Sequence, residues 1–584
     1  MAPTILWFRR DLRLDDHPAL LAACARGPVL PLFILDPALL HQPETAVARV
    51  AFLLESLRAL DADLRRRGGR LLVRHGEPAA VLLELARACG AAGVLAHTDS
   101  ERIVGRVRDA RVARALERER IRLRWIEPPG AAAELLSYPA WRRFWHTSVA
   151  EGPLAPPSCV PVPPPASGAD QPGDQPADHP ADPLADRALP SLAELGLASD
   201  AKPLPPAGTA AAFGLLERFL AGPSARTYHW QLSYPAARAT TGISPYLKFG
   251  VISHRRCLER LSPLAEGDGT ARRSWHQLVS RLRWGAGMAQ RFRYLPQLEL
   301  RSLWPAHDDP TAEQLSASQA ELYAAWCEGR TGFPIVDAAM RCLLAEGGWW
   351  ELNFRTRAIS ASFLTHLCGI DWRWGALHFM RHLIDGDAAI DHWQWAMQAG
   401  ATQSGPGGWA RIYHPGQVAV DRCDPQGRFI RRWCPELAEL TNDQLGQPPP
   451  ARRRQVGYPA MVLDYEQARR HRRQLLQNRA AQVLPEAASL SPLPERLLPF
   501  AADRFPTAVL DWADGESLDL WPAGLQAGSL DPPAQKALLS WVLMARSSPA
   551  ARPAAPAGRR RGQAPGPGPQ APVAGGARPR APPP

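Results

Sequence analysis

The first 126 residues alternate short apolar runs with helical patterns, and this alternation limits the possible folds more than any other sequence feature. Five runs have the length and composition of buried strands, at 4–8, 29–35, 71–74, 93–96 and 122–125. Helical patterns separate them at 18–25, 47–67, 78–89 and 106–119. The alternation predicts a parallel, Rossmann-like α/β sheet with helices on both faces. No GxGxxG turn follows the first run, so the usual dinucleotide-binding fingerprint is missing.

Composition divides the whole chain into four predicted parts. They are an α/β domain at 1–130, a Pro-, Asp- and Ala-rich connector at 131–206, a mainly helical domain at 207–478 and a basic low-complexity tail at 479–584. From residue 152 onward the connector has too little apolar sequence for a core, so we expect it to be mobile. In the tail, which we expect to be largely disordered, only 510–521 and 534–544 have helical patterns.

Charge and cysteine content restrict the partners and the compartment. The formal net charge of +11 favours a polyanionic partner such as nucleic acid, although a solvated basic surface has the same composition. The nine cysteines include no CxxC pair, so we predict neither a disulfide framework nor a metal site. The N-terminus lacks a signal-peptide pattern and no apolar run reaches membrane-spanning length. We therefore expect a cytoplasmic protein without membrane contact.

Arginines, aspartates and tryptophans recur between 329 and 395 inside an apolar, helical background. Asp337, Arg357, Asp385 and Asp387 are the charged members that matter most here. Buried Arg and Asp side chains are costly unless they pair or hold a ligand. Several of them close together predict a polar, extended aromatic cofactor inside the helical domain.

An ordered set of sequence blocks resembles the photolyase/cryptochrome family. The blocks lie at 7–16 and 240–247, around Asp337, Asp385 and Trp393, and at 411–415 and 429–437. Apart from the connector, the resemblance covers roughly residues 3–475, and such an ordered set is far more specific than one short motif. It implies an α/β antenna domain followed by an all-helical domain that holds a U-shaped FAD. The departures described below indicate a divergent bacterial-type branch.

The resemblance assigns the FAD site residue by residue. The implied cofactor-binding set is Tyr228, Thr240, Thr241, Gly242, Ile243, Ser244, Trp275, Arg281, Asn353, Arg357, Asp385, Gly386 and Asp387. Hydroxyls and N–H groups of the 240–244 turn suit a pyrophosphate, although a Thr-Thr pair is more often a helix N-cap. Arg357 and Asp385 match an ion pair over the isoalloxazine, where a guanidinium stabilises the anionic reduced ring. A structural buried salt bridge is the alternative for this pair.

The resemblance places catalytic roles on Trp393, Trp372, Asp391 and Gln277. Trp393 and Trp372 match the two flavin-proximal members of a tryptophan electron-transfer chain, whereas tryptophan in general is a core-packing residue. Spacing places Ser316 at the outermost position of that chain. Trp304, Trp374 and Trp349 are the possible substitutes.

The resemblance assigns DNA-binding roles to Gln277, Ser280, Arg355 and Trp395, which would receive a damaged dinucleotide flipped out of the duplex. Gln277 and Ser280 stand where cyclobutane-dimer photolyases carry a glutamate and a tryptophan. A glutamine cannot supply a proton, so the lesion type stays open. The candidates for a phosphate-binding rim are Arg431, Arg432 and 452–454, although any one of these arginines is more often a solvated charge than a phosphate contact.

The position near flavin N5 has two possible occupants. Counting forward from Asp387 gives Asp391, an aspartate as in plant cryptochromes, whereas counting back from Trp393 gives Ala389. An aspartate at this place would supply a proton to the flavin. Asn353 is offset by one residue from the family's flavin-contacting asparagine.

Three functional hypotheses follow. The leading one is a monomeric DNA photolyase, in which blue light drives an electron from reduced FAD to a pyrimidine dimer in UV-damaged DNA. The alternative is a cryptochrome-type photoreceptor without repair activity. Of the three hypotheses, only this one requires a signalling partner. The third is an α/β nucleotide-binding protein without light chemistry. The family uses folate or deazaflavin antennas, and the N-terminal sequence does not decide between them.

Overall fold

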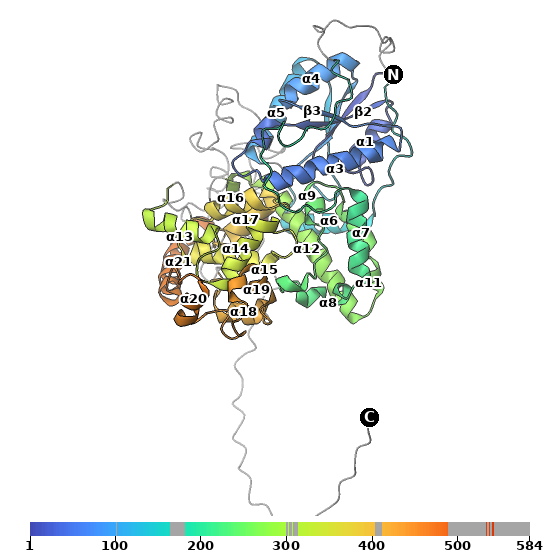
Figure 1. Cartoon of the computed structure of the whole chain (residues 1–584). Helices are drawn as coiled ribbons and strands as arrows, with labels where there is room; N and C mark the ends of the chain where they lie inside the picture. The colour runs from blue at the N-terminus through green and yellow to red at the C-terminus, as the bar shows by residue number, and fades with distance from the viewer. Residues whose placement is uncertain are drawn as a thin grey trace, which may run out of the picture. The chain divides into compact units, whose positions relative to one another are not determined.

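The computed structural model describes residues 1–100, 102–163, 182–299, 302, 307, 314–402, 411–488, 533, 537, 540 and 541. The N-terminal part is an α/β domain and the following part is helical (Figure 1). This is the predicted fold class. The helical pattern at 510–521 and Trp304 lie outside the described residues.

The α/β domain contains one parallel sheet with the strand order β3-β2-β1-β4-β5. Its strands are β1 Thr4–Phe8, β2 Val29–Leu35, β3 Leu72–His75, β4 Gly93–His97 and β5 Leu123–Ile126. Its helices are α1 Pro18–Cys24, α2 Pro37–Leu40, α3 Val47–Arg65, α4 Pro78–Cys89 and α5 Ile103–Arg118. Every residue of β1 and β2 is buried, as in a sheet covered on both faces. The loops after the neighbouring strands β1 and β4 meet at the carboxyl edge of the sheet, which in this architecture is where ligands bind.

The helical domain is built around a long central helix, α12 (Gly269–Tyr294). The remaining α-helices are α7 Thr209–Ala221, α8 Ser224–Gln231, α9 Ser244–Lys248, α10 His254–Leu261, α11 Pro263–Glu266, α13 Ala317–Cys327, α14 Pro334–Glu346, α15 Phe354–Ser362, α16 Trp372–His382, α17 Ala388–Gln398, α18 Gln417–Cys423, α19 Arg428–Trp433, α20 Pro450–Val456 and α21 Tyr465–Ala488. Short 3-10 helices lie at η1 Pro235–Ala237, η2 Pro296–Glu299 and η6 Pro435–Leu437, and η5 Phe363–Leu367 is a π-helix. Helix α8 packs against α12, α17 packs against both α12 and α16, and α15 packs against α14 and α17 (Figure 1). Within the described chain, no helix has the length and apolarity that a membrane crossing needs.

The connector prediction is wrong at its N-terminal end, because residues 138–150 form the helix α6, Tyr138–Ala150. Trp141 and Trp145 of α6 are fully buried, and α6 packs against α10 and α12. The aromatic residues at Trp141 and Trp145 recur at helical spacing, which gives this segment an apolar face that the average composition of 131–206 conceals.

The next part of the connector is bound to the α/β domain through its main chain. The carbonyl of Pro161 accepts a hydrogen bond from Val29 N at 2.6 Å, and Val160 N donates to Arg67 O at 2.8 Å. The guanidinium of Arg74 donates to Pro183 O and Ala185 O at 2.6 and 2.7 Å. The described parts of the connector are therefore attached to the domain, which corrects the expectation of a mobile link.

Part of the C-terminal tail is also packed against the fold. Trp541 is fully buried, and its Nε1 donates to Leu136 O at 2.6 Å. Its ring lies 5.3 Å from Tyr138 and 5.4 Å from both Trp141 and Tyr294, measured between ring centroids. The four described tail residues, 533, 537, 540 and 541, are helical. The last three of them lie within the predicted helical pattern at 534–544. A low-complexity tail thus contains at least one docked aromatic anchor.

Candidate functional site

A cavity of about 440 Å³ lies inside the helical domain. Its walls come from the 240–244 turn and from α8, α12, α15 and α17. The predicted cofactor residues that line it are Tyr228, Thr240, Thr241, Gly242, Ile243, Ser244, Arg281, Asn353, Arg357, Asp385, Gly386 and Asp387. Asp391 and Trp395 line it as well. The structure therefore brings together residues that are up to 167 positions apart in the sequence.

The 240–244 turn borders one end of this cavity and is not a helix N-cap. The following helix α9 begins at Ser244, and its N-cap is Ile243 without a capping side chain. Gly242 has a φ of +71°, and a Cβ at this position would lie 2.0 Å from a ring carbon of Trp350. Only glycine satisfies both the left-handed backbone and the close approach of the indole. The hydroxyl-bearing residues Thr240, Thr241 and Ser244 are thereby kept at the cavity wall.

Tyr228 of α8 is buried beside this turn, with 7% of its surface exposed. Its ring packs edge-on against Phe219 at 5.9 Å between centroids. Burial raises the pKa of Tyr228 to about 12, although Arg281 opposes the shift. The phenol is therefore a neutral hydrogen-bonding group at the cavity wall.

Arg357 and Asp385 form the predicted ion pair at the cavity. Arg357 Nη2 lies 3.2 and 3.1 Å from the two carboxylate oxygens of Asp385. The same guanidinium donates to Leu352 O and Gly348 O at 2.9 and 3.1 Å, which fixes its orientation. The Asp385 side chain is 6% exposed, so solvent screens this pair poorly. A fixed positive group at a cavity wall is suited to a ligand that carries or gains negative charge.

Three residues of the cavity wall each have a buried polar side-chain atom without a hydrogen-bond partner in the described structure. The atoms are Asp391 Oδ2, Asn353 Nδ2 and Trp350 Nε1. Asn353 uses its Oδ1 to cap α15, accepting from Arg355 N and Thr356 N at 3.0 and 3.1 Å, so its amide nitrogen remains for a ligand. Unpaired buried polar atoms are rare in native proteins. Together they indicate that the cavity receives a polar ligand.

Asp391 lies on α17, one helical turn after the N-cap residue Asp387. The pKa values of the two carboxyl groups are shifted in opposite directions. Burial raises the pKa of Asp391 well above its usual value, and Arg357 and Arg49 offset this only in part. Burial would also raise the pKa of Asp387, but Arg10, Lys248 and the N–H groups at the start of α17 hold it below the usual value. Asp387 is therefore a carboxylate, and Asp391 is a candidate for holding a proton at the cavity wall. Of the two candidate N5 positions, Ala389 does not line the cavity in the described structure.

The predicted electron-transfer tryptophans are buried behind the cavity rather than in its wall. Trp393 is fully buried and Trp372 is 2% exposed. The ring of His392, the residue before Trp393, lies 5.9 Å from that of Trp372. Of the proposed outer members, Trp349 lines the cavity beside Gly242, so it is not an outer residue. Trp374 is half-buried on α16 and its ring lies 5.4 Å from Tyr323.

The predicted lesion-contacting residues do not form one group. Trp395 lines the cavity and packs edge-on against Phe379 at 5.0 Å. Arg355 is outside the described cavity lining and donates to Tyr413 OH at 2.9 Å. On the described α12, Gln277, Ser280 and Trp275 are half-buried and are not part of the cavity wall. Only Trp395 among these predictions therefore reaches the cavity itself.

Two of the predicted rim arginines are structural. Arg453 is 5% exposed and donates to the carbonyls of Pro448, Gly332 and Pro459 at 2.7 to 2.8 Å. Arg431 donates to the carbonyls of Gln426, Ala438 and Leu440. Arg432 pairs with Glu346 and Glu351, whereas Arg452 and Arg454 are exposed.

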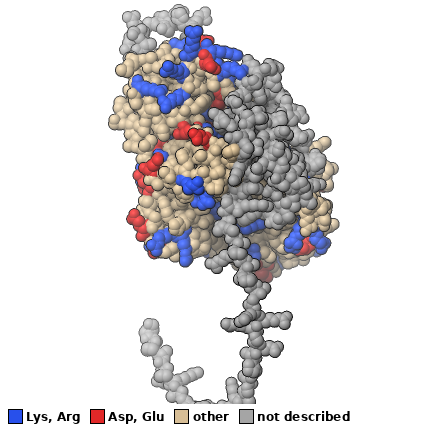
Figure 2. Space-filling model, turned by 180° about the vertical axis from the view of Figure 1, so that it is seen from behind, with Lys and Arg blue, Asp and Glu red and all other residues tan. Residues whose placement is uncertain are grey.

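Among the described residues visible in Figure 2, Lys and Arg do not form one continuous stripe. There Lys and Arg are interspersed with Asp and Glu, and basic side chains are most evident on the α/β part. The net charge of the sequence is therefore not evidence for a DNA-binding groove on that face.

Two further polar clusters have structural explanations. Asp337 accepts from Thr331 N, Thr331 Oγ1 and Gly332 N at 2.6 to 3.0 Å and from Tyr458 OH, so it fixes a turn instead of holding a ligand as expected. Asp11 Oδ2 lies 2.7 Å from His97 Nδ1 and 3.1 Å from His17 Nε2. The other ring nitrogens accept from the N–H groups of Ala19 and Leu20. Both histidines therefore donate to Asp11, and this arrangement does not offer lone pairs to a metal ion.

Sequence reasoning missed several residues of the cavity wall, above all Trp284, Trp350 and Phe354. Trp284 lies three residues after Arg281 on α12, and this helical spacing would have placed both on one face. Trp350 lies two residues after the Gly347–Gly348 pair, and the sequence does not show toward which part of the fold its side chain points. Phe354 lies under the Arg281 guanidinium, whose carbon is 4.5 Å from the ring centroid.

Comparisons with known proteins agree with this geometry. The family model for DNA photolyase matches residues 4–128, and that for the FAD binding domain of DNA photolyase matches 278–478. A deoxyribodipyrimidine photo-lyase of Synechococcus sp. is 35% identical over 506 residues, covering 83% of this chain and 99% of that protein.

Two solved structures are similar over most of the chain. A bacterial class III photolyase from Agrobacterium tumefaciens has a TM-score of 0.68 at 25% identity, covering 82% of this chain and 98% of that one. A Synechocystis cryptochrome has a TM-score of 0.67 at 22% identity, covering 81% and 99%, a likeness that shows the fold alone. The two-domain fold, the polar cavity in its helical half and these relatives together establish that the chain belongs to the FAD-dependent DNA photolyase family.

Proposed function

We propose that this protein binds UV-damaged DNA and uses blue light to split pyrimidine dimers. The observation that carries the proposal is the cavity, because it gathers Arg357, Asp385, Asp387 and the 240–244 turn with three unpaired polar atoms. A cavity of about 440 Å³ is in the usual range for small-molecule sites, roughly 300–1,000 Å³.

The cavity residues fit FAD by chemical type. The hydroxyls of Thr240, Thr241 and Ser244 and the phenol of Tyr228 suit the phosphates. The Arg357 guanidinium, held by Gly348 O and Leu352 O, is suited to the electron-rich edge of the ring system. When bound, FAD supplies the light-driven one-electron chemistry, and the protein supplies binding, orientation and electrostatics.

The role that we propose for the carboxyl group of Asp391 is to hold a proton beside the cofactor. Asp391 lines the cavity, its Oδ2 is buried without a hydrogen-bond partner in the described structure, and its pKa is raised by burial. His392 Nδ1 lies 3.5 Å from the same oxygen, and burial lowers the pKa of His392 to about 3, so this histidine is neutral. The position of Asp391 is also the specific observation in favour of the alternative, a blue-light photoreceptor without repair.

Trp395 is the proposed contact for a flipped base, since it is the predicted lesion residue that lines the cavity. Gln277, Ser280 and Arg355 are proposed to contact the DNA strand around the cavity rather than its interior. Trp393 and Trp372 are proposed to carry electrons toward the cofactor. The lesion could be a cyclobutane dimer or a 6-4 product, and the absence of a glutamate at 277 leaves both open.

A second cavity of about 190 Å³ between the sheet and α3 is the proposed site of an antenna chromophore. Trp7, Phe8 and Phe33 supply aromatic walls. Arg9 and Arg102, which also line it, are paired with carboxylates, so the aromatic walls are the feature that suits a planar chromophore of the folate or deazaflavin type. We further propose that the protein is cytoplasmic and that it acts as a monomer. Light scattering of the purified protein tests the oligomeric state.

The decisive experiment is a repair assay with the reduced holoprotein. Duplex DNA with one cyclobutane dimer or one 6-4 product is illuminated with blue light, and dimer loss is measured by chromatography. Repair that stops in the dark and in Arg357→Met supports the proposal. A protein that binds FAD and photoreduces it, yet repairs neither lesion, contradicts repair and favours the photoreceptor.

Asp391→Asn separates the two functions further. Asparagine is close in shape to a protonated aspartate, so FAD binding should stay within about threefold of the wild type. For a photoreceptor, the pH dependence of the illuminated absorption spectrum should change. For a repair enzyme, dimer splitting should be nearly unaffected.

A further inference from the structure

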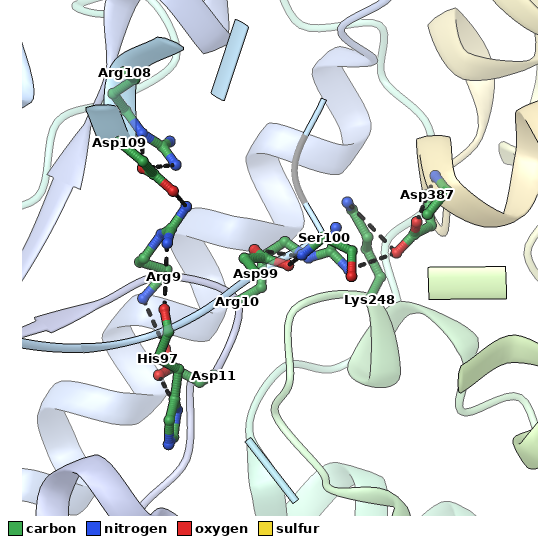
Figure 3. Close-up of polar contacts among 11 residues, drawn as sticks. Arg9, Arg10, Asp11, His97, Asp99, Ser100, Arg108, Asp109, Lys248 and Asp387 are labelled. Carbon is green, nitrogen blue, oxygen red and sulfur yellow. Dashed lines mark hydrogen bonds and ion pairs between the residues drawn. The ribbon is translucent and has the colours of Figure 1, made fainter. Parts of the chain in front are cut away.

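Two arginines of the α/β domain contact the turn that carries the FAD-site carboxylates. This turn, residues 383–387, joins α16 to α17 and includes Asp385, Gly386 and Asp387. The arginines are Arg10, which follows β1, and Arg49 on α3. Figure 3 shows Arg10 between Asp99 of the α/β domain and Asp387. The contacts join segments that are more than 330 residues apart in the sequence.

Arg10 forms an ion pair with a residue that lines the FAD cavity. Its Nη2 lies 2.7 Å from Asp387 Oδ2, and its Nε lies 3.5 Å from Asp99 Oδ2. Asp99 follows β4, so adjacent strands supply both members at the carboxyl edge of the sheet. Asp387 in turn caps α17 by accepting from Ala389 N at 3.0 Å. The start of the helix that carries Asp391, Trp393 and Trp395 is therefore tied to β1.

Arg49 holds the other side of the same turn. Its Nη1 donates to Met380 O and Leu383 O, both at 2.8 Å, and its Nη2 donates to Glu44 O at 3.0 Å. A cation at the last carbonyls of α16 also complements the helix dipole. Burial lowers the pKa of Arg49 to about 10, and Asp385, Asp391 and Asp387 oppose the shift, so the group stays charged at neutral pH.

The turn leaves no room for a side chain at its centre. A Cβ on Gly386 would lie 2.5 Å from Arg49 Nη1 and 3.2 Å from Met380 Sδ. Arg10, Lys248 and Gly386 each line both the FAD cavity and the cavity of the α/β domain. Movement of Arg10 would therefore change the wall of the FAD cavity directly, whereas Arg49 lines only the cavity of the α/β domain and acts on the FAD cavity through the turn that it contacts.

We propose that Arg10 and Arg49 are positioning residues for FAD, through which the α/β domain fixes the 383–387 turn and thereby aims Asp385 and Asp387 at the cofactor. The inference depends on occupancy of the cavity by FAD and not on repair activity. It assigns the N-terminal domain a part in the FAD site that is independent of any antenna.

The first test uses Arg10→Gln and Arg10→Lys in purified holoprotein. FAD affinity is measured from the fluorescence of flavin released on dilution, and the midpoint potential of bound FAD by redox titration. Arg10→Gln should weaken FAD binding about 10- to 100-fold, the range expected when a charge-assisted hydrogen bond is lost. Its midpoint potential should fall, because less positive charge remains to offset the negative charge gained on reduction. Arg10→Lys retains the charge and should restore the potential toward the wild type.

Arg49→Gln and Gly386→Ala test the same turn from the second side. Both should weaken FAD binding, the first by removing the two carbonyl contacts and the second by displacing the guanidinium. The matched control is Arg58→Gln, since Arg58 is also on α3 but is exposed and pairs only with Glu55 in the described structure. This control should leave FAD affinity and potential unchanged.

The readouts separate positioning from general stability. A purely structural role would lower the melting temperature of the Arg10 variants while leaving the midpoint potential of the remaining bound FAD unchanged, and that result would overturn the proposal. Unchanged FAD affinity and potential in Arg10→Gln would overturn it as well. If Arg49→Gln does not fold, the partly exposed Arg10 still provides both measurements.

Discussion

The guanidinium carbon of Arg291 lies 3.3 Å from the ring centroid of Trp393. Both side chains are buried, at 3% and 0% exposure. Burial pulls the pKa of Arg291 well below its usual value, but a guanidinium keeps its proton in proteins. A fixed cation thus rests on the indole that is proposed to deliver electrons to the FAD site, and it disfavours the positive charge that this indole gains when it is oxidised.

Removing this cation should make the indole a better electron donor. We expect Arg291→Met to speed photoreduction of bound FAD on the order of tenfold, because two like charges this close cost a few kcal/mol even in a polarisable interior. Flash photolysis with a thiol as the external reductant measures the rate. Arg283→Met, on the same helix but at the surface beside His146, should behave as the wild type. Slower photoreduction in Arg291→Met would contradict the electrostatic argument.

Trp393→Phe should slow photoreduction by roughly 100-fold or more while the FAD content stays near that of the wild type. The electron would have to bypass a ring that is much harder to oxidise, yet the residue does not line the cavity in the described structure. Absorbance of bound FAD under steady illumination measures both quantities. Trp145→Phe is the control, since Trp145 is equally buried but lies on α6. Unchanged kinetics in Trp393→Phe would exclude this tryptophan from the electron path.

Gly242→Ala should abolish FAD binding. The added Cβ would lie 2.0 Å from Trp350, whose ring forms part of the cavity wall. Gly457→Ala is a matched control, because Gly457 has almost the same φ of +70° but no atom within 4 Å of its Cβ position. The control should cost about 1 kcal/mol in unfolding free energy from backbone strain alone and keep FAD. Equal FAD loss in both variants would show that strain, and not the indole contact, decides the effect.

Stability should fall as the pH drops from about 6.5 toward 4. Burial lowers the pKa of His17 to about 4 and of His366 to about 3. The unfolded chain therefore takes up protons near pH 6.5 that the folded chain refuses, which favours unfolding at acid pH. His366 Nε2 donates to Gln398 O at 2.7 Å and its Nδ1 accepts from Arg472, so protonation would place two cations together.

Melting temperatures across this pH range check the prediction. His366→Gln can keep a donor and an acceptor without titrating, so its loss of stability on acidification should be smaller than that of the wild type. A melting temperature that is constant between pH 6.5 and 4 would contradict the assignment of neutral, buried histidines.

Trp541→Ala should release the docked part of the tail. Tyr138 N donates to Ser540 Oγ at 2.9 Å, so hydrogen exchange of the Tyr138 amide reports directly on docking. We expect this amide to exchange at least about tenfold faster in the variant, given that truncation of a buried tryptophan typically costs about 3–5 kcal/mol. Trp230→Ala is the control, since Trp230 is 49% exposed. Equal exchange in both variants would mean that the tail does not protect α6.

The strands were predictable to within one residue because all of β1 and β2 is buried, which leaves continuous apolar runs in the sequence. The order of the proposed cofactor residues along the chain is specific, and all of them except Trp275 lie in the described cavity wall. Arg431 and Arg453 were misassigned, because the sequence does not distinguish an arginine that binds loop carbonyls from one that binds phosphate. Trp350 was missed because its approach to Gly242 depends on tertiary packing.

Several arginines of the α/β domain bind the connector through its main-chain carbonyl oxygens, which every residue type carries. Arg67, Arg70 and Arg74 donate to the carbonyl oxygens of Pro157, Leu184, Pro183 and Ala185. A contact of this kind does not depend on which amino acid presents the oxygen. The attachment through these arginines therefore tolerates a change of side chain at the residues that present the oxygens, whereas the ion pair of Arg65 with Asp186 requires a carboxylate.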